Sequence, residues 1–290
     1  MQLDDVLTTL GRHFEFAPLA DVLAANQAGD GSSLRLAVTF DDGFDLIASG
    51  ALDVLNAHGV KATTFVLTTM LDNRNLMWRN KLSAILTLRG EERAVSAYNA
   101  LMQRTGSSRV GAGAELLAGA MRWDMARKDE LTDELWAACD MPPQSEFLDE
   151  HRPYFTARGL ARWLADGHAV GLHSATHPDC SRLDADGVRA ELVDPARRLC
   201  AELERGSLAL SYPFGRRCRP AQERLLAETG LFDCALGIRG FSPHGTDPLR
   251  LERASIETDA RFSVYGKALL GYPRSPRVPS ARQRGAGRLG

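Results

Sequence analysis

The stretch "VTFDDGFD", residues 38–45, places two adjacent carboxylates, Asp41 and Asp42, at the end of an apolar run. That run, residues 34–40, has the composition of a strand. Two neighbouring negative charges repel each other, so a strand end is an unusual place for both of them. Gly43 follows at once and lets the chain turn sharply, with both side chains on one side. The sequence therefore predicts a strand that ends in a functional pair of acids.

Strand-like and helix-like segments alternate on both sides of a long interval, residues 72–150. Residues 44–59 carry apolar side chains on one helical face, and Gly59 stands where a C-terminal cap belongs. Residues 60–68 are β-branched and apolar, which is typical of a buried strand. Downstream we expect strands at 168–173, 207–213, 232–238 and 249–256, and helices at 155–166, 183–204 and 219–229. Such alternation predicts parallel βα units, in an open doubly wound sheet or a barrel.

The interval 72–150 breaks this alternation. It contains helical patterns, such as the one at residues 93–103, and no convincing strand. We interpret it as a helical insertion in a single domain that spans residues 1–270. The insertion is either a lid or substrate-binding subdomain, or additional scaffold. The tail, residues 271–290, is rich in Pro, Gly and Arg, and we predict that it is disordered.

Composition excludes several classes of function. Of the 290 residues, 44% are hydrophobic and 25% are charged, which is ordinary for a soluble globular protein. A net charge of −2 argues against a general nucleic-acid or membrane-surface binder. The five cysteines are odd in number and form no CxxC pair, which favours reduced thiols. Since we recognise neither a signal peptide nor a transmembrane run, we expect a cytoplasmic protein; the sequence does not indicate its oligomeric state.

Polar residues follow two further predicted strands. The segment "HAVGLHSATHP" ends one strand with His173 and continues to His177, four residues later. The segment "LALSYPFG" ends another with Tyr212, Pro213 and Phe214. In parallel α/β folds the carboxyl ends of the strands meet at one edge. We therefore expect these residues to share a site with the two acids.

Two imidazoles and a carboxylate suit a divalent metal ion. Three protein ligands leave one coordination position open, which is the arrangement of a catalytic zinc site. The remaining acid is then placed to accept a proton from an attacking water molecule. This division of labour explains the acid pair, because the cation offsets the repulsion between the carboxylates. We expect Zn²⁺, with Co²⁺, Ni²⁺ or Mn²⁺ as alternatives.

Three motifs in this order, "TFDDG" (39–43), "HSATHP" (173–178) and "YPFG" (212–215), resemble those of the polysaccharide deacetylase family, the NodB-homology group of carbohydrate esterases. The resemblance covers residues 34–70 and 150–256. It implies a distorted, often incomplete (β/α) barrel. It also implies metal-dependent hydrolysis of an N-acetyl group, or sometimes an O-acetyl or N-formyl group, on a sugar. The expected partner is thus an acylated amino-sugar substrate, in a glycan, a glycolipid precursor or a small glycoside; the net charge argues against a nucleic acid.

The resemblance also implies roles for individual residues. Asp41 would be the catalytic base. The metal ligands would be Asp42, His173 and His177. The backbone N–H of Phe214 would help to stabilise the oxyanion.

Several positions depart from the family pattern or support it less directly. Ser174 would brace the histidine loop by a hydrogen bond. Many members carry Arg two residues before the motif Pro, where this chain has Ser211. Arg253 is the candidate for supplying the missing positive charge. The late Leu-x-His motif, which donates the general acid, has no clear match; His244 is the nearby candidate, with a surface-loop histidine as the alternative.

Substrate contacts are predicted from the aromatic and turn residues. Tyr212 and Pro213, in the Tyr-Pro-Phe-Gly turn, are candidates for substrate binding. Trp78, just past a predicted strand, is the candidate sugar platform, and a core anchor is the alternative reading of this and the other tryptophans.

Two other classes of function use similar residues. A two-histidine, one-carboxylate Fe(II) oxygenase needs the same ligands, but it is usually built on an all-β jelly roll. A catalytically silent, sugar-binding relative is the other alternative; the presence of Asp41 argues against it, and the unmatched general acid favours it.

Overall fold

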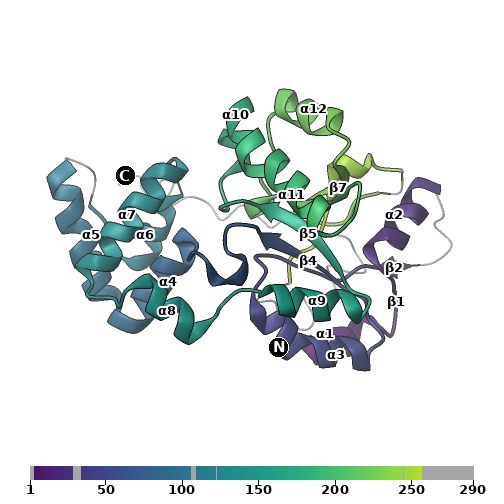
Figure 1. The fold of residues 1–290 in the computed structure, drawn as a ribbon, viewed down its shortest axis with the longest axis horizontal. Coiled ribbons are helices and arrows are strands. Elements are labelled where there is room, and N and C mark those ends of the chain that lie inside the picture. The colour runs from purple at the N-terminus through teal and green to yellow at the C-terminus, as the bar shows by residue number, and fades with distance from the viewer. Residues whose placement is uncertain (1–2, 29–33, 106–108, 122, 244, 257–290) are drawn as a thin grey trace, which may run out of the picture.

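The computed structural model describes residues 3–28, 34–105, 109–121, 123–243 and 245–256. Its centre is a parallel sheet with the strand order β3-β4-β5-β6-β7-β8, curled into a half-barrel with helices around it (Figure 1). The strands are β3 (Thr39–Phe40), β4 (Thr63–Leu67), β5 (Ala169–Ser174), β6 (Leu208–Ser211), β7 (Phe232–Gly237) and β8 (Leu251–Glu252). This arrangement confirms the predicted α/β class and the distorted, incomplete barrel.

Two predicted strands are shorter than expected. The run 34–40 is divided into β2 (Arg35–Leu36), which pairs with β1 (Glu15–Phe16), and β3, which pairs with β4. The prediction of one continuous strand was wrong because the chain changes its partner at the edge of the sheet. The expected strand at 249–256 shrinks to β8 for a related reason, since β8 is the other edge and has one neighbour.

Arg253, directly after β8, links the two edges of the curled sheet. Its guanidinium donates a hydrogen bond to the Thr39 hydroxyl of β3 over 2.8 Å. Its Cζ also lies 5.3 Å from the ring centroid of Phe65 in β4. At the carboxyl ends of the strands, the side chain of Arg253 therefore bridges the two outer strands, β3 and β8, which no further strand of the described residues connects.

Helices that follow the strands surround the sheet. The helices of this part are α1 (Leu3–Leu10), α2 (Leu19–Ala28), α3 (Leu52–Ala57), α9 (Ala157–Ala165), α10 (Ala185–Val188), α11 (Asp194–Glu202) and α12 (Pro220–Glu228). Short π-helical turns lie at Ile47–Ala51 (η1) and Arg189–Val193 (η4), and 3₁₀ turns at Leu71–Asn73 (η2), Cys180–Arg182 (η3), Pro213–Gly215 (η5) and Pro248–Arg250 (η6). The expected helices at 44–59 and 183–204 thus each contain a π-helical turn. Gly59 ends the first with φ +65°, as its predicted cap position requires.

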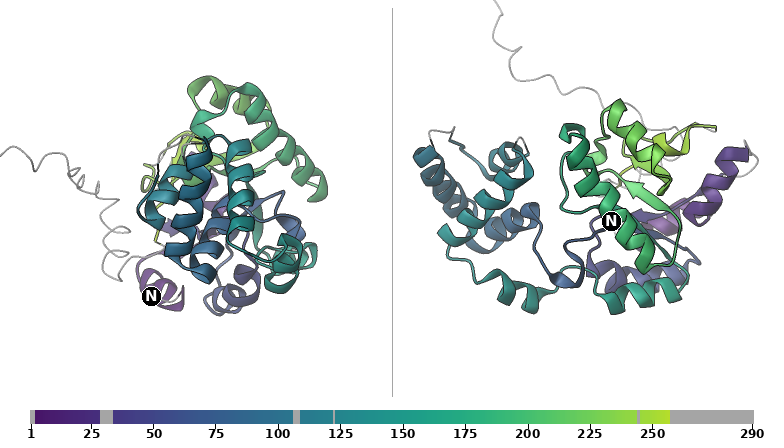
Figure 2. Two further views of the ribbon diagram at one scale, coloured as in Figure 1. Left: turned by 90° about the vertical axis from the view of Figure 1, so that its left-hand side faces the viewer. Right: turned by 45° about the horizontal axis from the view of Figure 1, so that its top comes forward.

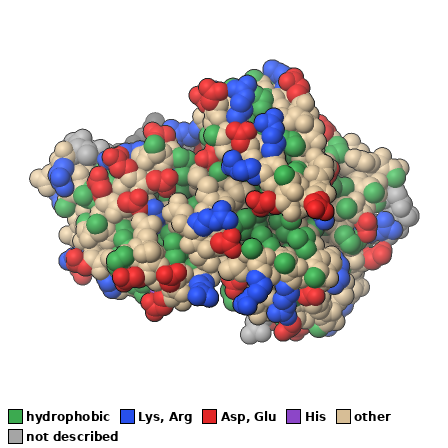
Figure 3. Space-filling view, in the orientation of Figure 1, with side chains coloured by type: hydrophobic (Ala, Val, Ile, Leu, Met, Phe, Trp, Pro, Cys, Tyr) green, Lys and Arg blue, Asp and Glu red, His purple; other side chains and the backbone are tan. Residues whose placement is uncertain are grey.

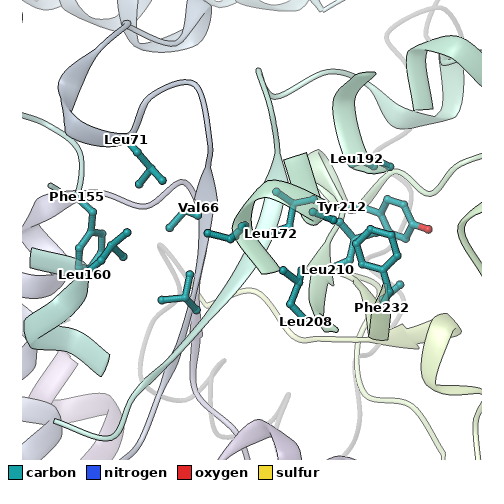
Figure 4. Packing of buried hydrophobic residues seen from close by; sticks show 14 of the residues in the cluster. Val66, Leu71, Phe155, Leu160, Leu172, Leu192, Leu208, Leu210, Tyr212 and Phe232 are labelled. Carbon is teal, nitrogen blue, oxygen red and sulfur yellow. The ribbon is translucent and has the colours of Figure 1, made fainter. Parts of the chain in front are cut away.

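The core lies between the sheet and these helices. Val66, Leu172 and Leu210, from three neighbouring strands, form one apolar layer (Figure 4) and are fully buried. All five residues of β4 are buried, as expected for a central parallel strand with both faces covered. Burying each such side chain contributes about 1.5–3 kcal/mol, so this layer holds the strand ends in place.

The described residues of the interval 72–150 form helices and no strand. These are α4 (Trp78–Arg89), α5 (Glu91–Thr105), α6 (Gly113–Ala120), α7 (Met125–Ala138) and α8 (Gln144–His151). They pack around an apolar cluster that also takes in Leu67 of β4, and they lie beyond the carboxyl ends of the strands (Figures 1 and 2). Their reading as an insertion in one domain stays a prediction, and the tail 271–290 lies outside the described residues.

Charged side chains of both signs lie at the surface, and the cysteines lie inside, in the part of the chain that the structure describes. Acidic and basic side chains are interspersed over the face seen in Figure 3, with no broad field of one sign. Among the described residues, no helix combines the length and the apolar character that crossing a bilayer requires. The five cysteines are buried and form no disulfide.

Gly171→Ala is expected to lower the free energy of unfolding by about 1–3 kcal/mol, the usual cost of forcing extra atoms into a packed core. A Cβ at Gly171 would lie 2.6 Å from the Phe65 ring and 2.7 Å from the Ala209 carbonyl oxygen. That oxygen belongs to the neighbouring strand and moves only with the sheet. Urea unfolding measures the effect. The control is Gly206→Ala, where nothing lies within 4 Å of the new Cβ; equal stability of the two variants would contradict the packing described.

Candidate metal centre and catalytic acid

Asp42, His173 and His177 come together at the carboxyl edge of the sheet. One ligand atom from each lies within 4.8 Å of the other two. Asp42 Oδ1 is 3.4 Å from Nε2 of both histidines. The sequence separates the first of these residues from the last by well over a hundred positions, so the convergence expected from the strand ends is present.

His173 is held in the tautomer that a metal ligand needs. It lies in β5 and is 1% exposed. Its Nδ1 lies 2.8 Å from the Ser211 carbonyl oxygen in β6. Because a carbonyl only accepts, Nδ1 carries the proton and donates it, and the lone pair of Nε2 faces Asp42. Such a hydrogen bond at the far nitrogen is the usual support of a metal-binding imidazole.

His177 stands in a strained loop that several bonds hold in place. Its φ is +68°, a left-handed conformation that costs a non-glycine residue about 1–3 kcal/mol. Its N–H donates to Ser174 Oγ over 2.9 Å, as the brace suggested for Ser174 requires. Its carbonyl accepts a hydrogen bond from the indole N–H of Trp78 over 3.3 Å. Strain of this kind is retained where the surroundings determine the conformation, as at a binding site.

The electrostatics of His177 favour the neutral form that binds metals. Burial lowers the pKa of His177 well below its ordinary value, and the nearby charges of His173 and Arg79 lower it further. Neutral imidazole has the free lone pair that coordination needs. With Asp42 as a carboxylate, the donor set of two imidazoles and one acid therefore fits a zinc-class divalent ion.

Glu191, on the π-helical turn η4, fastens the histidine loop from outside. Its carboxylate accepts hydrogen bonds from the Thr176 N–H over 3.0 Å and from the Thr176 hydroxyl over 2.7 Å. Its carbonyl accepts from the Ala175 N–H over 2.9 Å. Sequence reasoning missed Glu191, because a single acid in an amphipathic helical pattern looks like a solvated side chain. A π-helical turn is frequent near functional sites, but no sequence pattern indicated this one.

Glu191→Ala is expected to weaken metal affinity by about 10–100-fold, the usual effect of losing an outer support of a metal ligand. The reason is that Thr176 loses both of its acceptors and the strained loop before His177 is released. Titration of the metal-free protein with Zn²⁺ measures the affinity without any assay of activity. Glu202→Gln, at an exposed position of α11, is the control; an unchanged zinc affinity in Glu191→Ala would show that the loop keeps its shape alone.

The acid loop is held by the chain that returns from the helical segment. Asp42 and Gly43 have φ values of +69° and +66°, which turn the chain sharply, as predicted for Gly43. The Phe155 N–H donates to the Gly43 carbonyl over 2.9 Å, and the Asp45 N–H donates to the Pro153 carbonyl over 2.8 Å. The end of the helical segment therefore shapes the loop that carries Asp42.

Asp41 lies beside the three-ligand group and is bound by Arg253. Arg253 donates to Oδ1 over 2.9 Å and to Oδ2 over 2.8 Å. The Ser211 hydroxyl lies 3.1 Å from Oδ1 and is itself 2.6 Å from the same guanidinium. Arg253 thus brings a positive charge beside Asp41, where the sequence analysis suggested it; its catalytic role stays a prediction.

The ion pair keeps Asp41 charged. Burial opposes the negative charge, but the attraction of Arg253 and hydrogen bonds from Arg253 and Ser211 outweigh it and hold the pKa of Asp41 well below its ordinary value. The side chain is still 32% exposed, so a small molecule can reach it. Asp41 is therefore an accessible carboxylate, fixed in orientation and separate from the metal ligands.

The expected substrate contacts of three side chains were wrong. Tyr212 is 1% exposed and belongs to the core layer (Figure 4), and Pro213 is buried. Successive side chains alternate along a strand, so if Ser211 faces Asp41, Tyr212 faces the core. Trp78 is also 1% exposed, with the Lys128 ammonium 4.9 Å from its ring centroid. It braces the His177 carbonyl and offers no open face to a sugar.

Phe214 contacts the metal group, and His244 lies outside the described residues. The Phe214 ring centroid is 4.4 Å from that of His177, and the residue has φ +57°. Gly215 follows in a place where a Cβ would lie 2.2 Å from Ile238 Cγ1, so only glycine fits the turn. The Phe214 main chain is thus near the ligands, and its role as an oxyanion donor stays a prediction.

Comparison with known proteins supports the resemblance. Residues 28–106 match the family model described as polysaccharide deacetylase; this range includes both acids and ends before the two histidines. No curated protein sequence matches the chain.

Solved structures share the fold at low sequence identity. The deacetylase PplD from Streptococcus pyogenes, solved with acetate, is 15% identical with a TM-score of 0.54, over 87% of this chain and 79% of that one. The BpsB deacetylase domain from Bordetella bronchiseptica is 16% identical with a TM-score of 0.52, over 87% and 83%. IcaB from Ammonifex degensii is 14% identical with a TM-score of 0.51, over 91% and 85%. The matched sequence and the shared fold confirm that the protein resembles the polysaccharide deacetylase family.

Proposed function

We propose that the protein is a metal-dependent hydrolase that removes an N-acetyl or other small acyl group from an amino sugar. The observation that carries this proposal is the different environment of the two adjacent acids. Asp42 lies with the two histidines, while Asp41 is bound by Arg253 and Ser211. One acid is thus suited to hold a cation and the other to accept a proton.

Asp42 Oδ1, His173 Nε2 and His177 Nε2 would hold the metal, which we propose is zinc. A divalent cation held by these atoms supplies Lewis acidity, which polarises an acyl carbonyl and lowers the pKa of water. The small number of protein ligands leaves room for a substrate oxygen or water.

Asp41 acts as the base in this proposal. Its carboxylate is ionised at neutral pH and accepts a proton from the water that attacks the acyl carbon. The C–N bond then breaks, and this proton passes to the amine that leaves. Arg253 weakens the basicity of Asp41 but fixes its orientation through two hydrogen bonds. The backbone N–H of Phe214 donates to the oxygen that becomes negative during the attack, since fixed donors of this kind stabilise developing charge.

Two alternatives remain to be separated by experiment. The parallel sheet is unlike the all-β jelly roll on which the Fe(II) oxygenases are usually built. A silent sugar-binding relative has no need for the ion pair that orients Asp41, so this pair favours an active enzyme. The deacetylase PplD, which shares the fold, was solved with acetate, the product of deacetylation. The cytoplasmic location stays a prediction.

Acetate release from N-acetylglucosamine, its methyl glycoside and its 1-phosphate tests the proposed function. The zinc-loaded protein is expected to release acetate, to stop after treatment with a chelator, and to recover when zinc returns. Bound zinc without acetate release from any of these or other N-acylated amino sugars would favour the silent relative. Oxygen consumption by the Fe²⁺-loaded protein would instead favour the oxygenase.

A further inference from the structure

Arg79 lies at the mouth of the site, in the first turn of α4. Its Cζ is 5.8 Å from the ring centroid of Phe214. The same ring packs edge-on against the metal-group residue His177. Arg79 is exposed, so its guanidinium is accessible to a ligand from solvent.

The guanidinium of Arg79 makes no hydrogen bond and no ion pair with any described residue. The other arginines near the site differ: Arg253 is bound to Asp41, Arg216 to Asp179, and Arg217 to Glu252. Among the described residues, the guanidinium of Arg79 contacts an aromatic ring alone, which leaves all five N–H donors available.

This position is unfavourable for a protein that only binds a metal. The Phe214 ring lies between Arg79 and His177: it is in contact with Arg79 on one side, and its centroid is 4.4 Å from that of His177 on the other. A positively charged side chain beside a metal site repels the metal ion. The arrangement is favourable when an anion lies between the guanidinium and the site, because Arg is the side chain best suited to phosphate and carboxylate groups.

We infer that Arg79 binds an anionic substituent of the substrate, a phosphate or a carboxylate carried next to the acylated amino group. This inference rests on the proposed function and narrows its substrate class to anionic amino sugars. Arg79 is then a specificity-determining residue supplied by the helical segment, which thereby takes part in substrate recognition.

The test compares anionic and neutral substrates in the zinc-loaded protein. The probes are N-acetylglucosamine 1-phosphate, N-acetylglucosaminuronic acid and the neutral methyl N-acetylglucosaminide. Arg79→Met keeps most of the side-chain length and removes the charge. We expect it to raise KM for an anionic probe by about tenfold, the equivalent of about 1.4 kcal/mol, with kcat and the neutral probe unaffected. Arg79→Lys should recover part of the affinity, and whether the phosphate or the carboxylate shows the effect identifies the anion.

Arg198→Met is the matched control, because Arg198 is exposed on α11. The C-terminal end of α11 leads to the amino end of β6, whereas the metal group lies at the carboxyl ends of the strands. Zinc content is measured for every variant. If Arg79→Met changes KM equally for neutral and anionic probes, or for neither, the inference is wrong although deacetylation stands.

Binding of the products separates the two proposals. Glucosamine 1-phosphate and methyl glucosaminide have no acyl group, so their affinities are measured by calorimetry without turnover. Tighter binding of the phosphate that disappears in Arg79→Met supports the anion site even if no acetate is ever released. Equal binding of the two products by the wild-type protein contradicts it.

Discussion

Asp41→Asn is expected to keep its metal and to lose turnover by about 10²–10⁴-fold, the usual contribution of general acid–base catalysis. Asn has nearly the same shape as Asp, but its amide does not accept a proton from water at neutral pH. The metal is retained because Asp41 is not part of the three-residue group formed by Asp42 and the two histidines. Steady-state acetate release and zinc content, measured on the same preparation, check both halves of the expectation.

Ser211→Ala is the control for orientation. It removes the hydroxyl beside Asp41 Oδ1 but leaves both hydrogen bonds from Arg253. We expect a much smaller loss of turnover than in Asp41→Asn. If Asp41→Asn instead loses zinc, the assignment of the two acids is reversed; if it keeps full activity, Asp41 is not the base.

Asp42→Asn is expected to weaken zinc binding by more than about 10–100-fold. That range is the usual effect of losing an outer support of a metal ligand, and Asp42 is itself a proposed ligand. The variant loses the only anionic member of the donor set, and the buried Nε2 atoms of His173 and His177 lose their carboxylate neighbour. Zinc titration followed by acetate release at rising zinc concentration measures the effect. Activity should partly return in excess zinc.

The contrast between the two acid variants is more informative than either alone. Rescue by zinc in Asp42→Asn and no rescue in Asp41→Asn is the pattern of one ligand and one base. Loss of zinc in both variants would mean that both acids coordinate the metal, and the base would have to lie elsewhere.

The sequence predicts the central strands and the meeting of the motifs because both depend on local patterns. β4 to β7 are short segments rich in apolar residues, so their positions follow from composition. Once these strands are parallel, the residues after them must share one edge, which is why Asp42 and His173 were expected together.

What the sequence does not predict depends on tertiary neighbours. The division of residues 34–40 follows from the presence of β1 as a second partner, which no local pattern encodes. Trp78 is buried by its contact with the His177 loop, a long-range packing arrangement. Glu191 and Arg79 belong to helices whose composition is ordinary, and their roles come from what lies opposite them in space.

Diffraction from crystals soaked in zinc, with anomalous data collected at the zinc edge, tests the central claim most directly: one acid of the pair binds the metal and its neighbour does not. The account predicts a single strong peak at the site, about 2.0–2.2 Å from Asp42, His173 and His177 ligand atoms, with Asp41 still bound to Arg253. A peak with an Asp41 oxygen in its coordination shell, or no peak between the two histidines, would contradict it.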